Sequence, residues 1–324
     1  MLESSSRSNR TCRRAEQPQS GAAVISLDFE LRWGMHDVYG LNFDAYRANL
    51  EQVRNVVPRL LRLFGDHDIG ATWAAVGALA CTDWDEYFRR APPPPNYKST
   101  SLRVKPEYAD LDPRGELHFA PDLVKQIVVA PRQELGTHTF SHLYLREEGI
   151  TAEDVAADLE AASRLFQEQY GIEPVSLVFP RNQPAFLDVV RAASIKMWRG
   201  NPGPWYYETE DTRHNGPLPR ALKLLDALNP MRRLAAPLEA DMTRASLFLR
   251  LNLPPPLWAA HIRRIKGELD ALDQGGIFHI WFHPHNLGQE MNLRLARVEQ
   301  VLELIAERRK RGRLLSLAMG ELVQ

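Results

Sequence analysis

The chain has 324 residues, a length that fits either two domains or one barrel of alternating strands and helices with additions. Forty basic and 41 acidic side chains give a formal net charge of −1, which argues against a general nucleic-acid-binding protein. Apolar residues make up 44% of the chain and charged residues 25%, as is typical of a soluble globular protein. One of the two cysteines, Cys12, lies in a polar segment, so a disulfide framework is not expected.

The first 21 residues are rich in Ser and Arg and lack an apolar run of signal-peptide length. We therefore expect a disordered tail over residues 1–21. No stretch approaches the 18 apolar residues of a membrane span, so a transmembrane segment is not expected. A cytoplasmic location is the simplest interpretation of these features.

From residue 22 onward, short apolar runs alternate with longer amphipathic segments. In chain order, we expect strand 22–31, helix 44–64, strand 70–76, helix 121–129, strand 133–137, helix 151–171, strand 176–179, helix 184–194, strand 196–199, helix 257–272, strand 276–282, helix 292–309 and strand 314–318. Strands that alternate with helices predict an α/β fold with a parallel sheet, open or closed. Residues 83–119 and 202–256 interrupt this rhythm and are expected to be long, irregular insertions.

Ten histidines stand out, and two of them combine with carboxylates in patterns that carry chemistry. Asp28 and Glu30 are two residues apart on a strand, so their side chains point to the same side. His138 and His142 are four residues apart directly after a strand, a spacing that lets two imidazoles on one helical turn hold a metal ion. The alternatives are a solvated strand end for the acids and backbone-bonded, helix-start histidines.

Two further groups follow predicted strands. Arg181 follows the strand at 176–179 and could orient a carboxylate through a bidentate pair, although an ordinary surface arginine remains the alternative. His283 ends the strand at 276–282, with His285 as a loop residue or its partner and His279 deeper on the same strand.

Two histidines and one carboxylate form a set that accepts zinc, iron, cobalt or another divalent ion. A spare carboxylate and a spare histidine would supply a general base and a general acid. A metal lowers the pKa of water and polarises a carbonyl group. This combination of residues is therefore suited to the hydrolysis of an amide or an ester.

The order of these motifs resembles the NodB-type polysaccharide deacetylases, carbohydrate esterase family four. The segment from Gly70 to Gly77 is also similar to that family's second strand. The resemblance implies a distorted (β/α)7 barrel over residues 22–324, with the insertions at about 83–119 and 202–256. It also implies one divalent metal ion, with zinc preferred and cobalt, nickel, iron or manganese as alternatives.

Site roles follow from the same resemblance. Asp28 would be the general base, and Arg181 would orient it. His283 would be the general acid. The metal ligands would be Glu30, His138 and His142. Weaker candidates for substrate binding are Trp33, Trp198, Asn201, Trp205 and His285.

The chain departs from the family's usual motifs in two places. The usual pair of adjacent aspartates is replaced by Asp28-Phe29-Glu30, which is closer to the form found in the family's cytoplasmic and cyclic-amide-cleaving branches. The arginine motif ends in Asn182 and Gln183 instead of its usual residues. These departures favour a small, nucleotide-linked or lipid-linked amino sugar over an extracellular polymer.

Three functions remain open from the sequence. The first is a metal-dependent hydrolase that removes an N-acetyl or N-formyl group from an amino-sugar derivative. The second is a hydrolase of a non-sugar or cyclic amide that uses the same site. The third is a non-catalytic carbohydrate-binding relative, which the presence of a base, an acid and three ligands argues against. Whether residues 202–256 form a lid or an interface of a homo-oligomer is also open.

Overall fold

A computed structural model describes residues 20–44, 46–208, 216–272 and 276–323. Its strands form one parallel sheet in the order β6-β5-β4-β3-β2-β1-β8-β7, with β9 also paired to β1. The strands are β1 (Gly21–Phe29), β2 (Ala71–Ala75), β3 (Gln133–Thr137), β4 (Ser176–Val178), β5 (Met197–Gly200), β6 (Met242–Arg244), β7 (Leu247–Phe248), β8 (Ile277–Phe282) and β9 (Leu314–Leu317).

Strand β1 is the centre of the sheet, and all nine of its residues are buried. Its long apolar run suits a strand that is covered on both faces. One edge of β1 pairs with β8. The other edge pairs first with β9, from Gly21 opposite Leu314, and then with β2, from Ser26 opposite Thr72. The carboxyl end of β1 thus lies between β2 and β8.

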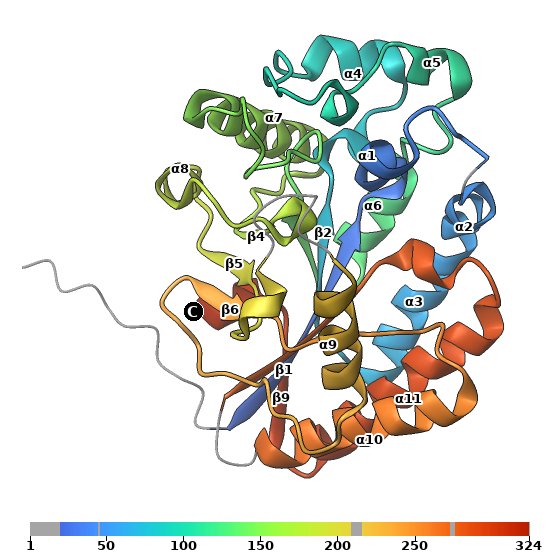
Figure 1. Ribbon diagram of the computed structural model, residues 1–324, viewed down its shortest axis with the longest axis vertical. Coiled ribbons are helices and arrows are strands. Elements are labelled where there is room, and N and C mark those ends of the chain that lie inside the picture. The colour runs from blue at the N-terminus through green and yellow to red at the C-terminus, as the bar shows by residue number, and fades with distance from the viewer. Residues whose placement is uncertain (1–19, 45, 209–215, 273–275, 324) are drawn as a thin grey trace, which may run out of the picture.

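One short segment, residues 242–248, brings the two ends of the sheet together. Its β6 part pairs with β5, and its β7 part pairs with β8. Between them, the Ala245 amide donates to the Gly200 carbonyl and the Ser246 amide to the His279 carbonyl, each at 2.8 Å. The sheet therefore curls into a barrel, which confirms the expected distorted (β/α)7 fold (Figure 1).

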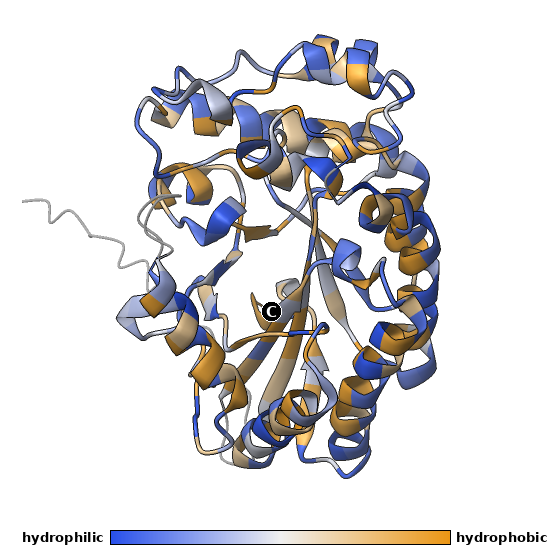
Figure 2. Cartoon of the chain, turned by 45° about the vertical axis from the view of Figure 1, so that its right-hand side comes forward, coloured by the Kyte–Doolittle hydropathy of each residue, from blue (hydrophilic) through white to orange (hydrophobic). Residues whose placement is uncertain are grey.

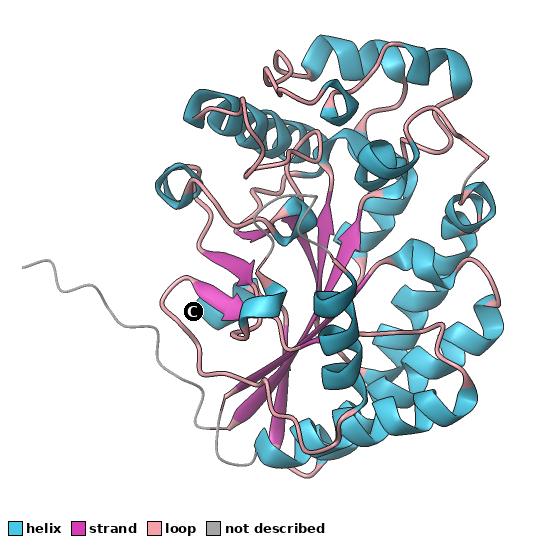
Figure 3. Ribbon diagram, viewed as in Figure 1, coloured by secondary structure: helices cyan, strands magenta, loops and turns pink. Residues whose placement is uncertain are grey.

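Most helices lie above and to the right of the strands in the view of Figure 3. The helices are α1 (His36–Tyr39), α2 (Arg47–Glu51), α3 (Val53–His67), α4 (Trp84–Arg90), α5 (Glu107–Leu111), α6 (Pro121–Val129), α7 (Ala152–Tyr170), α8 (Leu187–Ala192), α9 (Pro217–Leu228), α10 (Pro255–Ala271) and α11 (Met291–Lys310). They carry both hydrophilic and hydrophobic residues (Figure 2), as expected of helices with one buried face. Helix α7 begins with the capping box that Thr151 and Asp154 predict.

Two expectations about the chain's organisation need correction. The helix expected over 44–64 is two helices, α2 and α3. The first insertion contains α4 and α5, and the second contains α9, β6 and β7. Strands of three and two residues are too short to show a period in the sequence, because they are defined by their partners. The tail predicted for residues 1–21 lies outside the described residues, apart from Ser20 and Gly21, and β1 already begins at Gly21.

Across the described ranges, no helix combines the length and apolar character that crossing a membrane requires. Cys81 is a buried, free thiol.

Candidate active site

The two sequence-predicted carboxylates lie together at the carboxyl end of β1. Asp28 belongs to the strand, and Glu30 follows its last residue. Their exposed fractions are 3% and 5%. Both line a cavity of about 480 Å³, a size within the usual range for small-molecule sites. Buried carboxylates need cations or hydrogen-bond donors, and each of these two has them.

Asp28 is held by Arg199, which the sequence analysis did not assign to this role. The two terminal nitrogens of Arg199 donate to the two oxygens of Asp28 at 2.6 and 2.8 Å. The expected partner, Arg181, instead forms an ion pair with Asp37 while it lines the same cavity. The expectation that Arg181 orients Asp28 is corrected accordingly: the arginine that reaches this carboxylate comes from β5 instead of the turn after β4.

A chain of polar contacts connects Arg199 with buried Ser26, His279 and Thr243. Its Nη1 atom donates to Ser26 Oγ at 2.9 Å, and Ser26 Oγ lies 2.8 Å from His279 Nε2. His279 Nδ1 lies 3.4 Å from Thr243 Oγ1. Burial and the nearby Arg199 charge hold the pKa of His279 well below its usual value. A neutral His279 can accept a hydrogen bond from the Ser26 hydroxyl group. The Ser26 oxygen can then accept a hydrogen bond from Arg199.

Glu30, His138 and His142 form the predicted three-residue cluster. The Nε2 atoms of the two histidines lie 3.3 and 3.1 Å from Glu30 Oε2. One ligand atom from each of the three residues lies within 4.8 Å of the others. His138 Nδ1 lies 2.7 Å from the Val178 carbonyl, to which it can only donate, so its Nε2 carries the lone pair. Such an outer hydrogen bond is typical of a metal-binding histidine, and the donor set fits a divalent ion.

The segment that carries the two histidines is not the helical turn that their spacing suggested. Residues 138–142 form bends, and both Thr139 and His142 have positive φ angles, of 63° and 55°. Buried Asp158 of α7 accepts hydrogen bonds from the Phe140 and Ser141 amides. The rings therefore converge because a carboxylate on a neighbouring helix fixes an irregular loop.

His283 lies beside the two carboxylates. Its Nε2 is 3.5 Å from Glu30 Oε1 and 3.8 Å from Asp28 Oδ2, and its side chain is 20% exposed to the cavity. His285 is buried and stacks on His283, with ring centres 4.8 Å apart. Glu30, His283 and His285 form a second set of ligand atoms within 4.8 Å of one another.

Charge within the cluster keeps both carboxyl groups ionised. Burial raises the pKa of Asp28, but the charge and hydrogen bonds of Arg199 outweigh it, and the pKa is lowered. Burial also raises the pKa of Glu30, but the neighbouring imidazoles of His283, His138 and His142 hold it well below its usual value. Asp28 is thus a carboxylate that can accept a proton.

The weaker substrate-binding candidates differ in their positions relative to the cavity. Asn201 lines the cavity. Trp33 and Trp198 are buried in the core, and Trp33 Nε1 donates to the His118 carbonyl at 2.7 Å. Trp205 is 63% exposed, and it is not among the described residues that line the cavity. The expectation that Trp33, Trp198 and Trp205 meet the substrate is thus corrected, and His285 is covered by His283.

The cavity is also lined by two aromatic residues that the sequence analysis did not single out. Trp281 and Phe248 pack together, with ring centres 4.6 Å apart, and the Arg199 guanidinium lies 4.3 Å from the Trp281 ring centre. Both rings line the cavity beside His283. Trp281 belongs to β8, which His283 follows. Its position two residues before His283 in the sequence was the signal that could have identified it as a cavity residue.

Comparison with solved structures found similar folds. A protein of Mycobacterium smegmatis described as a polysaccharide deacetylase has a TM-score of 0.55 at 14% identity, covering 96% of this chain and 92% of that one. One from Pseudomonas aeruginosa PAO1 described in the same way has a TM-score of 0.55 at 13% identity, covering 93% and 89%. The PuuE allantoinase has a TM-score of 0.53 at 13% identity, covering 97% and 93%. At these identities, the similarity establishes the fold alone.

A search of curated proteins found no match. The family model described as polysaccharide deacetylase matches residues 35–197, which is half of the chain. This range contains His138 and His142, while Asp28, Glu30 and His283 lie outside it. The protein therefore belongs to the polysaccharide deacetylase family and is a hydrolase of carbon–nitrogen bonds other than peptide bonds.

Proposed function

We propose that this protein is a metal-dependent N-deacylase that removes an acetyl or formyl group from an amino-sugar derivative. The observation that carries the proposal is the convergence of Asp28, Glu30, His138, His142 and His283 on one cavity. Glu30, His138 and His142 would hold one divalent ion, for which zinc is the first candidate. When bound, the ion would lower the pKa of water and polarise the amide carbonyl.

Asp28 and His283 carry out the two proton transfers of the proposed reaction. Asp28 takes the proton of the attacking water, and the bidentate pair with Arg199 keeps its carboxylate ionised and oriented. His283 faces the same cavity and donates a proton to the leaving amine nitrogen as the carbon–nitrogen bond breaks. The base belongs to β1, and the acid follows the last residue of β8.

The cavity supports a compact substrate. Its volume of about 480 Å³ is that of a small-molecule site, and Trp281, Phe248 and Tyr207 offer apolar surface beside polar Asn201. Such a wall suits a sugar ring, which has apolar faces and polar edges. We therefore favour a small, nucleotide-linked or lipid-linked amino sugar.

The test is a substrate screen with the zinc-loaded protein. The panel contains N-acetyl and N-formyl amino sugars, free and linked to phosphate carriers, together with a cyclic ureide and chitin oligomers. Released acetate, formate or ring-opened product is measured. We expect hydrolysis of an N-acyl sugar that Asp28→Asn abolishes while the metal content is unchanged. Activity on the cyclic ureide alone, or full activity in the variant, would contradict the proposal.

A further inference from the structure

A second part of the cavity wall is basic. Arg220 and Lys223 of α9 and Arg250, which follows β7, line it together. Among the described residues that line this cavity, the only carboxylates are Asp28 and Glu30, and both lie in the cluster at the carboxyl end of β1. Three cations therefore line the cavity in addition to Arg181, which pairs with Asp37.

The three cations differ in exposure, since Lys223 and Arg250 are half-buried and Arg220 is exposed. Burial lowers the pKa of Lys223, and the charges of Arg250 and Arg220 lower it further. Burial also lowers the pKa of Arg250, and its Nε atom is buried without a hydrogen-bond partner in the described part of the chain. Lys223 Nζ lies 5.6 Å from the Tyr207 ring centre. Mutually repelling cations in a partly buried wall are stabilised by an anion.

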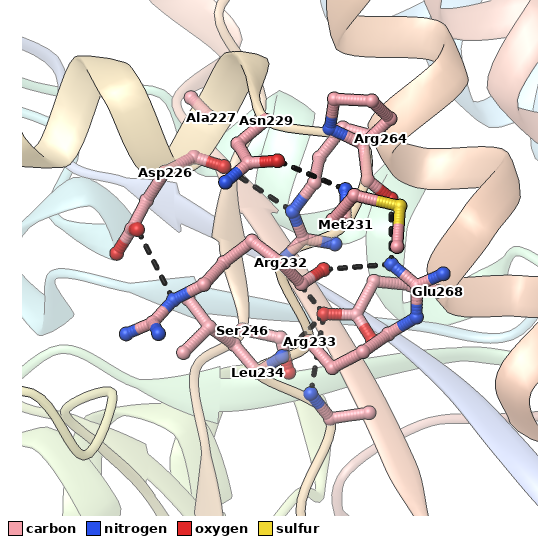
Figure 4. A network of polar contacts seen from close by, with 12 residues as sticks. Asp226, Ala227, Asn229, Met231, Arg232, Arg233, Leu234, Ser246, Arg264 and Glu268 are labelled. Atoms are coloured by element: carbon pink, nitrogen blue, oxygen red, sulfur yellow. Dashed lines mark hydrogen bonds and ion pairs between the residues drawn. The ribbon is translucent and has the colours of Figure 1, made fainter.

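Helix α9, which carries two of these cations, is fixed at its other end. The Asp226 carboxylate pairs with Arg232 Nε at 3.1 Å, and the Asp226 carbonyl accepts from Arg264 Nε at 3.2 Å. Glu268 pairs with Arg264 at 2.7 Å and accepts from the Leu234 amide. Figure 4 shows this network between the end of α9 and α10. The helix that carries Arg220 and Lys223 is therefore anchored to α10 through Asp226 and Arg264.

We propose that Arg220, Lys223 and Arg250 bind a phosphate or diphosphate group of the substrate, while the sugar's N-acyl group reaches the metal end. This inference rests on the proposed function, since it names the class of its substrate. A carboxylate carries one negative charge, whereas a phosphomonoester or a diphosphate diester carries more, so three cations match the phosphate better. The substrate class is thus a sugar attached to a nucleotide or to a lipid through phosphate.

The first arm of the test is binding without turnover. Inorganic pyrophosphate is titrated calorimetrically into protein loaded with one equivalent of zinc. The combined variant Arg220→Gln/Lys223→Gln/Arg250→Gln is compared with Arg263→Gln, which removes an exposed arginine from α10. We expect at least tenfold weaker binding in the combined variant and unchanged binding in the control. Equal affinity in the combined variant, or no binding to the wild type, would overturn the proposal.

The second arm is kinetic and separates the two carriers. The value of kcat/KM is measured for N-acetylglucosamine, UDP-N-acetylglucosamine and prenyl-diphosphate-linked N-acetylglucosamine. We expect one carrier-linked sugar to exceed the free sugar at least tenfold, and Arg250→Gln to reduce that ratio through KM. A ratio of one for both carriers would overturn the phosphate assignment. If no sugar is hydrolysed, the proposed function fails, while the calorimetric arm still decides whether the cations form an anion site.

Discussion

Arg199 donates to both oxygens of Asp28, at 2.6 and 2.8 Å, and both side chains are buried. A planar guanidinium is the side chain that can make two such parallel bonds. The pair fixes the direction of the carboxylate, and Ser26 and Asn182 fix the arginine in turn. The orientation of the Asp28 carboxylate therefore depends on Arg199 in β5 as well as on its own strand, β1.

Substitution Arg199→Lys tests this pair. The lysine keeps the charge but cannot hold both oxygens, so we expect kcat to fall by about 100-fold, the usual cost of a misplaced catalytic group, with little change in KM. The matched variant is Arg181→Lys, at the arginine that pairs with Asp37. Steady-state kinetics of both variants check the prediction, and a larger loss of kcat in Arg181→Lys would contradict it.

Asp158 is expected to position the histidine loop through the Phe140 and Ser141 amides. In Asp158→Asn, the amide group offers one acceptor instead of two, and its NH₂ faces a backbone donor. We expect zinc affinity to weaken by about 10- to 100-fold, as for other residues that orient metal ligands. Competition with a chelating dye measures it.

The control for this prediction is Glu160→Gln, an exposed position on the same helix. It removes a carboxylate from α7 without touching the loop. If Asp158→Asn bound zinc as tightly as this control, the loop would be held by other contacts.

His261 gives a prediction about acid stability. It is fully buried, with Nδ1 2.7 Å from the Ala227 carbonyl, and burial is the main cause that lowers its pKa to about 4. Between pH 6.5 and pH 4, the unfolded chain binds a proton here that the folded protein does not. Stability is therefore full above pH 6.5 and falls as the pH falls, by about 2 kcal/mol at pH 5 from this group.

Urea unfolding at pH 7.5 and pH 5 checks this contribution. The variant His261→Asn retains a donor for the Ala227 carbonyl but cannot titrate. We expect it to be less stable than the wild type at pH 7.5 and to lose less stability on acidification. Equal losses in the two proteins would show that His261 is not a source of acid sensitivity.

The regular elements were predictable because their side chains follow simple periods. The strand at Gln133–Thr137 has the expected bounds, and α7 begins at its capping box. The convergence of Asp28, Glu30, His138, His142 and His283 was also predictable, since residues after parallel strands meet at one edge of the sheet.

Other features depend on contacts that no local pattern contains. Arg181 follows β4 and Arg199 lies within the neighbouring strand β5, and the sequence does not distinguish which one reaches Asp28. Arg199 does, and it also donates to Ser26. The positive φ angles of Thr139 and His142 replace the expected helical turn. Strands β6 and β7 exist because β5 and β8 provide their partners.

The central claim is that Glu30, His138 and His142 bind one catalytic metal ion. A crystal structure of the zinc-loaded protein, with anomalous scattering at the zinc edge, tests it most directly. We predict one zinc ion with Glu30 Oε, His138 Nε2 and His142 Nε2 at about 2.0–2.2 Å, and with Asp28 and His283 farther away. A zinc ion bound by His283 and His285 instead, or no zinc at this cluster, would contradict the account.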